Sequence, residues 1–239
     1  MIGTFINVGT VLIGTAIGTV LGSRLPERIR ETVMHTLGLF TALLGVASGL
    51  AAFRPPLSEA VPRFAVLLVL GSLLFGAVIG EAVRIQQGLD RLGDVLRERF
   101  GRGQPRFTEG FVVASLVFCV GPLTILGSIQ DGLTGDFQLL AVKSLLDGFA
   151  ALAFASALGW GVGFSALVIL VFQGSLSLGA SALSGAFSAA MTASMSAVGG
   201  VMILGISLRL LDLRSVRVAN LLPALVIAPA AVAVVESVG

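Results

Sequence analysis

Residues 119–148 read CVGPLTILGSIQDGLTGDFQLLAVKSLLDG, and they are the polar exception in a strongly apolar chain. This stretch holds a Gly-Pro pair inside a helix-length run and Lys143, the single lysine of the sequence. It also repeats the phrase Ser-x-x-Asp-Gly, at 128–132 and at 144–148. Ionisable groups inside apolar segments are costly, so this stretch is the first place to look for function.

The composition predicts an all-α membrane protein. The 239 residues are 56% hydrophobic and 12% charged, with a mean hydropathy of +1.02. Soluble domains carry about 25% charged residues. Half that share, together with apolar runs of about 20 residues, indicates about eight transmembrane helices.

The residue counts argue against several kinds of site. One cysteine excludes an intrachain disulfide, and one histidine argues against a zinc site. The sequence has no GxxxxGK[ST] loop for ATP. Its arginines alternate with acids, which does not favour nucleic acid as a partner. We therefore expect no metal, no cofactor and no enzymatic activity.

Hydropathy divides the chain into four parts. The predicted spans are 3–22, 34–53, 64–81, 110–130, 138–158, 163–181, 188–208 and 219–237. Apolar residues at helical spacing among the arginines of 82–109 predict an amphipathic helix on the membrane surface. The parts are a first three-span repeat (1–81), a cytoplasmic amphipathic linker helix (82–109), a central two-span hairpin (110–160) and a second three-span repeat (161–239).

The arginines also predict the orientation. The loops after the first, third and seventh spans hold three, six and three arginines, whereas those after the second, fourth and sixth hold two, none and none. Arginine-rich loops stay in the cytoplasm. We therefore expect a multi-pass membrane protein with both termini outside.

The two ends of the chain resemble each other at an offset of 160 residues. Gly14-Thr15 matches Gly174-Ser175, and TALLG at 41–45 matches VMILG at 201–205. The first and sixth spans are predicted to cross in opposite directions. These observations predict an inverted 3+2+3 repeat with a central two-helix insert, a recurrent plan of secondary transporters.

The Gly-Pro pair predicts a break in the fourth span. Pro122 has no N–H, so the carbonyl near Phe118 loses its helical donor, and Gly121 adds backbone freedom. In lipid such a carbonyl needs another partner or a wet cavity. A kink without function is the alternative.

Asp147 is predicted to lie near the middle of the bilayer. It follows the start of the fifth span, Gln138, by nine residues, which is about 14 Å of helix in a core about 30 Å thick. A hairpin turn at 133–136 would place it level with Pro122 and close to Thr124. A carboxylate then faces a broken helix.

Two neighbours lie on the same side of the fifth span as Asp147. Lys143 precedes it by four residues, which allows an ion pair, and Ser144 precedes it by three. A charge at this depth costs several kcal/mol unless it is paired or hydrated. The pair is therefore a functional candidate, and a structural pair that only fixes the helix bundle is the alternative.

The remaining candidates supply oxygen ligands. Asp131 is expected nearer the outer face, as a gate or as a solvated helix-end residue, and Gln173-Gly174-Ser175 forms a second polar patch. Such oxygens suit protons, sodium or magnesium. The candidate substrate- or ion-binding residues are Asp147, Lys143, Ser144, Asp131, Ser128, Thr124, Gly121, Pro122 and Gln173.

The first span carries two further patterns. Gly14, Gly18 and Gly22 lie four residues apart on one face, which lets helices approach closely in lipid. Asn7 and Thr10 share a face and are expected to bond to a neighbouring helix or to line a cavity.

Several of these segments resemble a known family. GTFINVGTVLIGTAIGTVLG, CVGPLTILGSIQDGL, KSLLDG and FQGSLSLGA resemble the bacterial YqgA/YdfK-like membrane proteins, grouped as a domain of unknown function. The resemblance covers nearly the whole chain. It implies a multispan inner-membrane protein and implies no particular activity.

Three functions are compatible with the sequence. We favour a secondary transporter or ion-translocating protein for a small solute or ion, with the lipid bilayer and that solute as partners and a homo-oligomer as an option. The alternative is a non-transporting scaffold or sensor that acts through the arginine-rich helix 82–106. An intramembrane hydrolase would need Asp131 and Asp147 about 3 Å apart, whereas helix rise separates them by about 10 Å.

Overall fold

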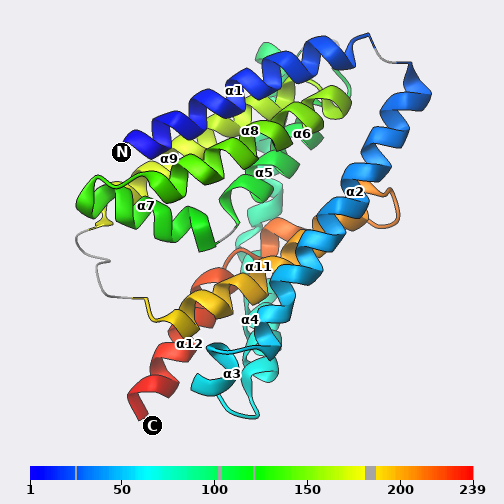
Figure 1. The fold of residues 1–239 in the computed structure, drawn as a ribbon. Coiled ribbons are helices and arrows are strands. Elements are labelled where there is room, and N and C mark those ends of the chain that lie inside the picture. The colour runs from blue at the N-terminus through cyan, green and yellow to red at the C-terminus, as the bar shows by residue number, and fades with distance from the viewer. Residues whose placement is uncertain (25, 102–103, 121, 181–186, 239) are drawn as a thin grey trace. The chain divides into compact units, whose positions relative to one another are not determined.

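The computed structural model describes residues 1–24, 26–101, 104–120, 122–180 and 187–238, and these residues form helices without any strand (Figure 1). Seven helical segments are long and apolar enough to span a membrane, or eight if one bent pair is a single span. The all-α membrane fold is therefore confirmed. The long helices of these segments are α1 (Ile2–Gly22), α2 (Glu27–Gly49), α4 (Ala65–Val83), α8 (Gln138–Leu158), α9 (Ser165–Leu178), α11 (Ala189–Leu210) and α12 (Ala224–Val238). Helices α9 and α12 reach spanning length only together with the 3-10 helices before them.

Short elements extend three of the spanning segments. They are η1 (Leu50–Phe53), α3 (Leu57–Ala60), η2 (Trp160–Phe164) and η3 (Val218–Leu221). The predicted linker helix is α5 (Ile85–Phe100), which leaves Leu92, Val95 and Phe100 exposed. These apolar side chains fit a helix that lies against a membrane surface.

Helix α2 begins at Glu27, seven residues before the predicted start of the second span at residue 34. The segment with Arg28 was expected to be a loop and is helical instead. Pro26 directly precedes the helix, where the missing proline N–H removes no helical bond. The part of a helix that extends beyond the hydrocarbon core is charged, so its composition in the sequence is like that of a loop.

The fourth span is broken where the Gly-Pro pair predicts. It consists of α6 (Phe107–Cys119) and α7 (Pro122–Thr134), which are bent by 64°. Pro122 is the first residue of α7, a position that needs no N–H. Gly121 lies outside the described residues.

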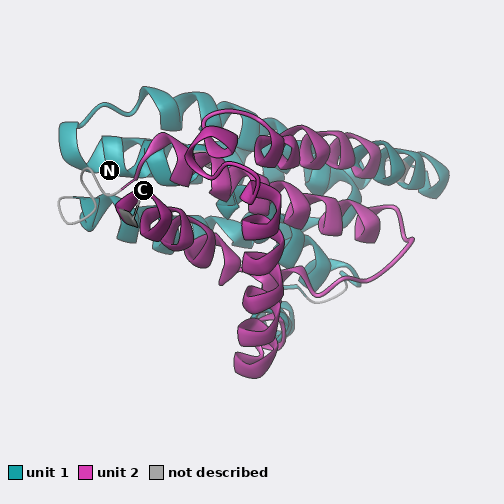
Figure 2. Ribbon diagram, turned by 90° about the horizontal axis from the view of Figure 1, so that it is seen from below, with its two compact units in different colours: residues 1–37, 89–184 teal, residues 38–88, 185–239 magenta. Residues whose placement is uncertain are grey.

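The chain forms two compact units, each of which contains segments from both predicted repeats (Figure 2). Unit 1 comprises Met1–Leu37 and Leu89–Ser184, and unit 2 comprises Gly38–Gly88 and Gly185–Gly239. The central hairpin therefore shares unit 1 with α1 and α9.

In unit 1, α1 packs along α8 through its glycine row. A Cβ atom on Gly14, Gly18 or Gly22 would overlap the carbonyl oxygens of Gly148, Leu152 and Ser156, in that order. This confirms that the row allows a close helix approach. Both sets of residue numbers rise together, so α1 and α8 run parallel. Two helices cross the membrane in the same direction only if an odd number of spans lies between them in the chain. Helices α2 and α4 are two such spans, so the parallel packing favours counting α6 and α7 together as the third.

Within each unit, helices that are 160 residues apart pack antiparallel. In α2 and α11 the facing pairs are Gly38 with Leu211, Gly45 with Leu204, and Gly49 with Gly200. Between α4 and the segment of η3 and α12, the facing pairs are Gly76 with Ala224 and Gly80 with Asn220. Between α1 with its preceding residue and the segment of η2 and α9, they are Thr15 with Gly163 and Met1 with Gly174. The inverted repeat stays a prediction, and these directions are those that it requires.

Candidate functional site

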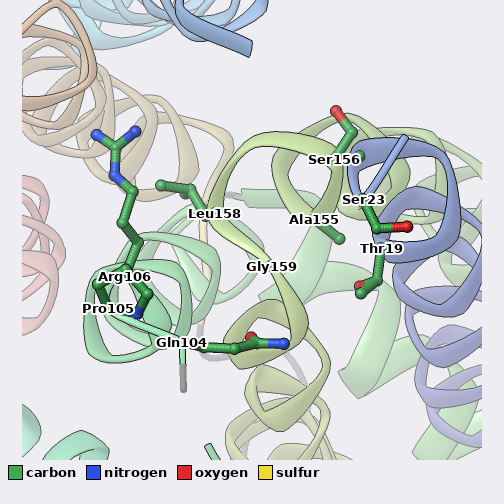
Figure 3. Close-up of a pocket in the computed structure, with 10 residues that line it drawn as sticks. Thr19, Ser23, Gln104, Pro105, Arg106, Ala155, Ser156, Leu158 and Gly159 are labelled. Atoms are coloured by element: carbon green, nitrogen blue, oxygen red, sulfur yellow. The ribbon is translucent and has the colours of Figure 1, made fainter. Parts of the chain in front are cut away.

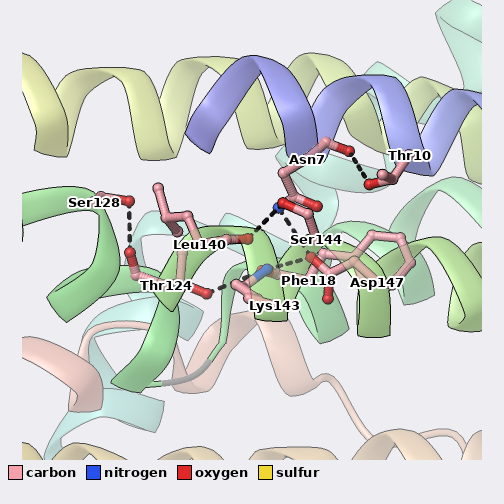
Figure 4. A network of polar contacts seen from close by, with 9 residues as sticks. All are labelled: Asn7, Thr10, Phe118, Thr124, Ser128, Leu140, Lys143, Ser144 and Asp147. Atoms are coloured by element: carbon pink, nitrogen blue, oxygen red, sulfur yellow. Dashed lines mark hydrogen bonds and ion pairs between the residues drawn. The ribbon is translucent and has the colours of Figure 1, made fainter. Parts of the chain in front are cut away.

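Asp147 links α8 to α1 in the interior of unit 1. Its Oδ2 atom accepts a hydrogen bond from Asn7 Nδ2 at 3.0 Å and forms an ion pair with Lys143 Nζ (Figure 4). The side chains of Lys143 and Asp147 are only 8% and 12% exposed. The spacing of four residues correctly predicts this pair. The structure adds Asn7, which binds the same carboxylate oxygen from another helix.

Ser144 does not bond to Asp147. It is fully buried on the same helix, but its hydroxyl donates to the Leu140 carbonyl at 2.6 Å. Such a bond to the preceding turn is a common way to satisfy a serine inside a helix. Ser144 therefore lies beside the ion pair without joining its hydrogen bonds.

Thr124 supplies the donor that the broken helix lacks. Its hydroxyl donates to the Phe118 carbonyl at 3.2 Å, and Ser128 in turn donates to the Thr124 carbonyl at 2.5 Å. This confirms that the freed carbonyl takes a new partner. Thr124 and Ser128 are both fully buried.

The break lies level with the ion pair. Gly127 of α7 faces Leu140 of α8, and the two helices form an antiparallel hairpin. Extending this register places Thr124 level with Lys143 and places Asp147 level with the gap between α6 and α7. Figure 4 shows the Lys143 side chain between Thr124 and Asp147.

Asp131 is buried, not solvated. It is 2% exposed, and its Oδ2 atom accepts from the Gly3 backbone N–H at 3.1 Å. Its Oδ1 atom lies 3.0 Å from the Met1 amino nitrogen, an ion pair by distance without hydrogen-bond geometry. The expectation of a solvated helix-end residue is therefore wrong. The first turn of α1 holds this carboxylate, as the positive end of a helix dipole favours.

The two carboxylates do not form a dyad. Asp131 binds α1 at Gly3 and Asp147 binds it at Asn7, which is one helical turn or about 6 Å further on. Aspartyl dyads need the carboxylates about 3 Å apart. The geometry does not favour the intramembrane hydrolase.

Gln173 is a buried amide without a bond. The side chain is 0% exposed, and neither Oε1 nor Nε2 has a hydrogen-bond partner among the described residues. Ser177, one turn later on α9, donates to the Ser128 carbonyl of α7 at 2.9 Å. Ser175 is exposed and bonds within α9, so the expected patch is Gln173 with Ser177 instead.

Thr4 was not predicted to belong to the site, and Asn7 was expected to bond to a neighbouring helix or to line a cavity. Both residues are 0% exposed, and Thr4 Oγ1 and Asn7 Oδ1 have no partner in the described parts of the chain. Their signal was present in the sequence as two polar residues at i and i+3 in an apolar span. The sequence did not show that Asn7 on this face binds Asp147.

A pocket of about 230 Å³ lies at the far end of α1 and α8 (Figure 3). Thr19, Ser23, Gln104 and Ser156 are among its polar lining residues, and Figure 3 shows Arg106 directed away from Thr19 and Ser23. Ser156 follows Asp147 by nine residues, or about 14 Å along α8. The pocket is therefore separate from the ion pair.

The interior of unit 1 offers hard donor atoms. Carboxylate, amide and hydroxyl oxygens meet there beside one ammonium group, a set that suits protons and hard cations rather than soft metals. Across the described residues there is no group of three or more His, Cys, Asp or Glu side chains that could hold a metal ion.

Comparisons with known proteins identify a family. The family model "Protein of unknown function (DUF554)" matches residues 2–233. The chain is 29% identical over 239 residues to "Uncharacterized membrane protein YdfK" of Bacillus subtilis (strain 168), covering 100% of this chain and 99% of the relative. It is 32% identical over 233 residues to "Uncharacterized protein YqgA" of Escherichia coli (strain K12), covering 95% and 94%. No solved structure matches the chain.

Proposed function

The chain belongs to the DUF554 family and is a multi-pass membrane protein, and we propose that it is a secondary transporter or ion-translocating protein of the inner membrane. It moves a small solute or ion past the break between α6 and α7 and has no catalytic activity of its own. Asp147 is the central residue of this site.

The observation that carries the proposal is the buried contact of Asp147 with Lys143 and Asn7 beside a broken helix. Charges inside a membrane bundle are expensive and are usually kept for function. A purely structural pair would be better replaced by apolar side chains of similar volume, because desolvation offsets most of the attraction.

The helix directions support a transporter. In each of three helix pairs, the two helices are 160 residues apart in the sequence and pack antiparallel within one unit. An inverted repeat requires this arrangement. Transporters built in this way bind their substrate near the bilayer midplane, on discontinuous helices. The arginine-rich loops support an orientation with both termini outside.

Exchange of partners at Asp147 is the proposed working step. The carboxylate holds the Lys143 ammonium when the site lacks cargo. A proton or cation that binds to Asp147 neutralises it and releases Lys143, which changes the contacts of α8 with α1. A ligand shifts such an equilibrium by its different affinity for the two states.

The test is flux in proteoliposomes with a panel of ions and small solutes. We expect the wild type to move at least one of them faster than protein-free vesicles do. Asp147→Asn should fall to the level of those vesicles because it keeps the shape of the side chain and removes its charge. Gly9→Ala, where an added Cβ meets nothing within 4 Å, should keep the flux. Absence of wild-type flux, or full flux in Asp147→Asn, contradicts the proposal.

One observation favours the scaffold or sensor alternative. The exposed apolar side chains of α5 stand beside arginines, as in a helix that binds a membrane surface or another protein. A pull-down with and without residues 82–106 tests it. Partner capture that survives the deletion rules this alternative out.

A further inference from the structure

Eight buried side-chain atoms in unit 1 have no hydrogen-bond partner among the described residues, and four of these atoms belong to Thr4, Asn7 and Gln173. These four are Thr4 Oγ1, Asn7 Oδ1, Gln173 Oε1 and Gln173 Nε2, and all three side chains are 0% exposed. Buried polar groups are nearly always bonded, either to protein or to an enclosed water or ligand. Unpaired atoms of this kind therefore indicate a place where something else binds.

The register of α1 and α9 brings two of these residues together. Thr15 faces Gly163 near one end of the contact, and Met1 faces Gly174 near the other. Interpolation along this antiparallel pair places Gln173 level with Ile2 and Gly3, less than one turn from Thr4. Both Thr4 and Gln173 are buried, so they lie in the interior within one turn of each other along the bundle.

The register of α7 and α9 directs Gln173 towards the broken helix. Ser177 donates to the Ser128 carbonyl, and the residues one turn earlier on these helices are Gln173 and Thr124. Residues four apart share a helix face. Gln173 therefore faces the level of Thr124, which bonds the freed carbonyl at the break.

Asn7 joins this group to the carboxylate. Asn7 follows Thr4 by three residues and therefore shares its helix face. Its Nδ2 atom binds Asp147, and its Oδ1 atom remains unpaired. A hydroxyl, two amides and one carboxylate from α1, α8 and α9 thus lie in the same buried part of unit 1.

We infer that Thr4, Asn7, Gln173 and Asp147 form a binding site for an alkali-metal cation of the sodium class. Three of the four unpaired atoms are oxygens, which suits a hard cation and not an anion. One carboxylate among neutral oxygens matches a single positive charge, whereas divalent ions favour more carboxylates or several retained waters. This inference rests on the proposed function and names its ion.

The cation would compete with Lys143 for Asp147. Both carry one positive charge, so the cation replaces the ammonium without changing the charge at the carboxylate. Lys143 then becomes available to a second partner, such as an anionic group of the solute. Binding of the ion and of the solute are thereby coupled through one carboxylate.

The test measures the thermal midpoint of the purified full chain in detergent. The probes are sodium, lithium and potassium chloride at rising concentration, each compared with choline chloride at equal ionic strength. We expect a saturable rise with at least one alkali cation, because a ligand that binds only the folded state stabilises it. Choline is too large for a site built from four side chains.

Two variants make the test specific. Gln173→Leu should lose the cation-dependent rise while its midpoint in choline stays equal to or above that of the wild type, because an unpaired amide is removed. Thr15→Val is the matched control, since Thr15 Oγ1 is also buried and unpaired on α1 but faces Gly163 instead. It should keep the rise.

Three results would overturn the inference: no alkali-specific rise in the wild type, an unchanged rise in Gln173→Leu, or an equal loss in Thr15→Val. The outcome is distinguishable from that of the flux assay. Flux without cation stabilisation contradicts only this inference, and cation stabilisation without flux of any ion or solute contradicts only the proposed function.

Discussion

The two units treat their polar side chains in opposite ways. In unit 2, Glu81 accepts from Arg217 at 2.5 Å and from Asn220 at 2.6 Å, and Asn220 Oδ1 accepts from the Gln86 N–H at 2.7 Å. Arg217 and Glu81 are 66% and 53% exposed. In unit 1, Lys143 and Asp147 are nearly enclosed, and neighbouring amides and hydroxyls lack partners.

The difference separates a structural cluster from a binding site. The Glu81–Asn220 contacts join η3 to the end of α4, and the buried amides of this cluster, Gln86 and Asn220, are hydrogen-bonded. They need nothing further. The cluster around Asp147 carries charge in the interior and is incomplete as it stands. Buried charge beside unpaired polar atoms, rather than polarity alone, distinguishes the site.

The largest contrast should come from breaking one ion pair in each unit. Lys143→Met leaves the Asp147 carboxylate buried without its cation, which costs about 3–5 kcal/mol. Arg217→Met breaks an exposed pair and costs about 0–1 kcal/mol. Thermal unfolding in detergent measures both. Equal losses would remove the distinction between the clusters.

Close helix packing gives the next largest effect. Gly18→Ala places a methyl group against the Leu152 carbonyl oxygen, and we expect the overpacking to cost about 1–3 kcal/mol. Gly9→Ala has open space and should be neutral or stabilising by up to about 1 kcal/mol. The thermal midpoints of the two variants give the comparison. A Gly18→Ala protein as stable as Gly9→Ala would contradict the parallel contact of α1 and α8.

The broken helix supports a smaller prediction. Thr124→Val removes the hydroxyl that donates to the Phe118 carbonyl, and we expect a loss of about 1 kcal/mol. Thr124→Ser keeps the donor and should retain most of the stability. The two midpoints should therefore differ, and equal destabilisation by both variants would show that the methyl group matters instead.

The smallest effect concerns salt. Glu81→Gln should destabilise by at most about 1 kcal/mol, and choline chloride near 1 M should abolish the difference because exposed pairs are screened. The destabilisation by Lys143→Met should persist in the same salt. A midpoint series in choline chloride checks both expectations, and a loss that fades equally in the two variants would argue that the Asp147 cluster is solvated.

Local pattern predicted the elements well. The span 138–158 matches α8 residue for residue, because a long apolar run lies between Gly135-Asp136 and Gly159. The start of α2 was missed because its first turns are charged. The Lys143–Asp147 pair follows from a spacing of four residues on one helix.

Contacts between helices that are far apart in the chain could not be predicted from the sequence. Asn7 and Asp147 are 140 residues apart, and nothing in either segment indicates that α1 lies against α8 at that level. Asp131 was misjudged because its partner is the backbone N–H of Gly3, which has no side-chain signature. The candidate carboxylates were therefore predictable, and the residues that bind them were not.

The most direct test of the account is flux through the double variant Lys143→Met/Asp147→Leu in proteoliposomes. Replacing both buried charges by apolar side chains of similar volume should leave stability neutral or improved. The account predicts a protein that folds as well as the wild type and moves no more ion or solute than protein-free vesicles. A folded double variant with wild-type flux would show that the pair only supports the bundle.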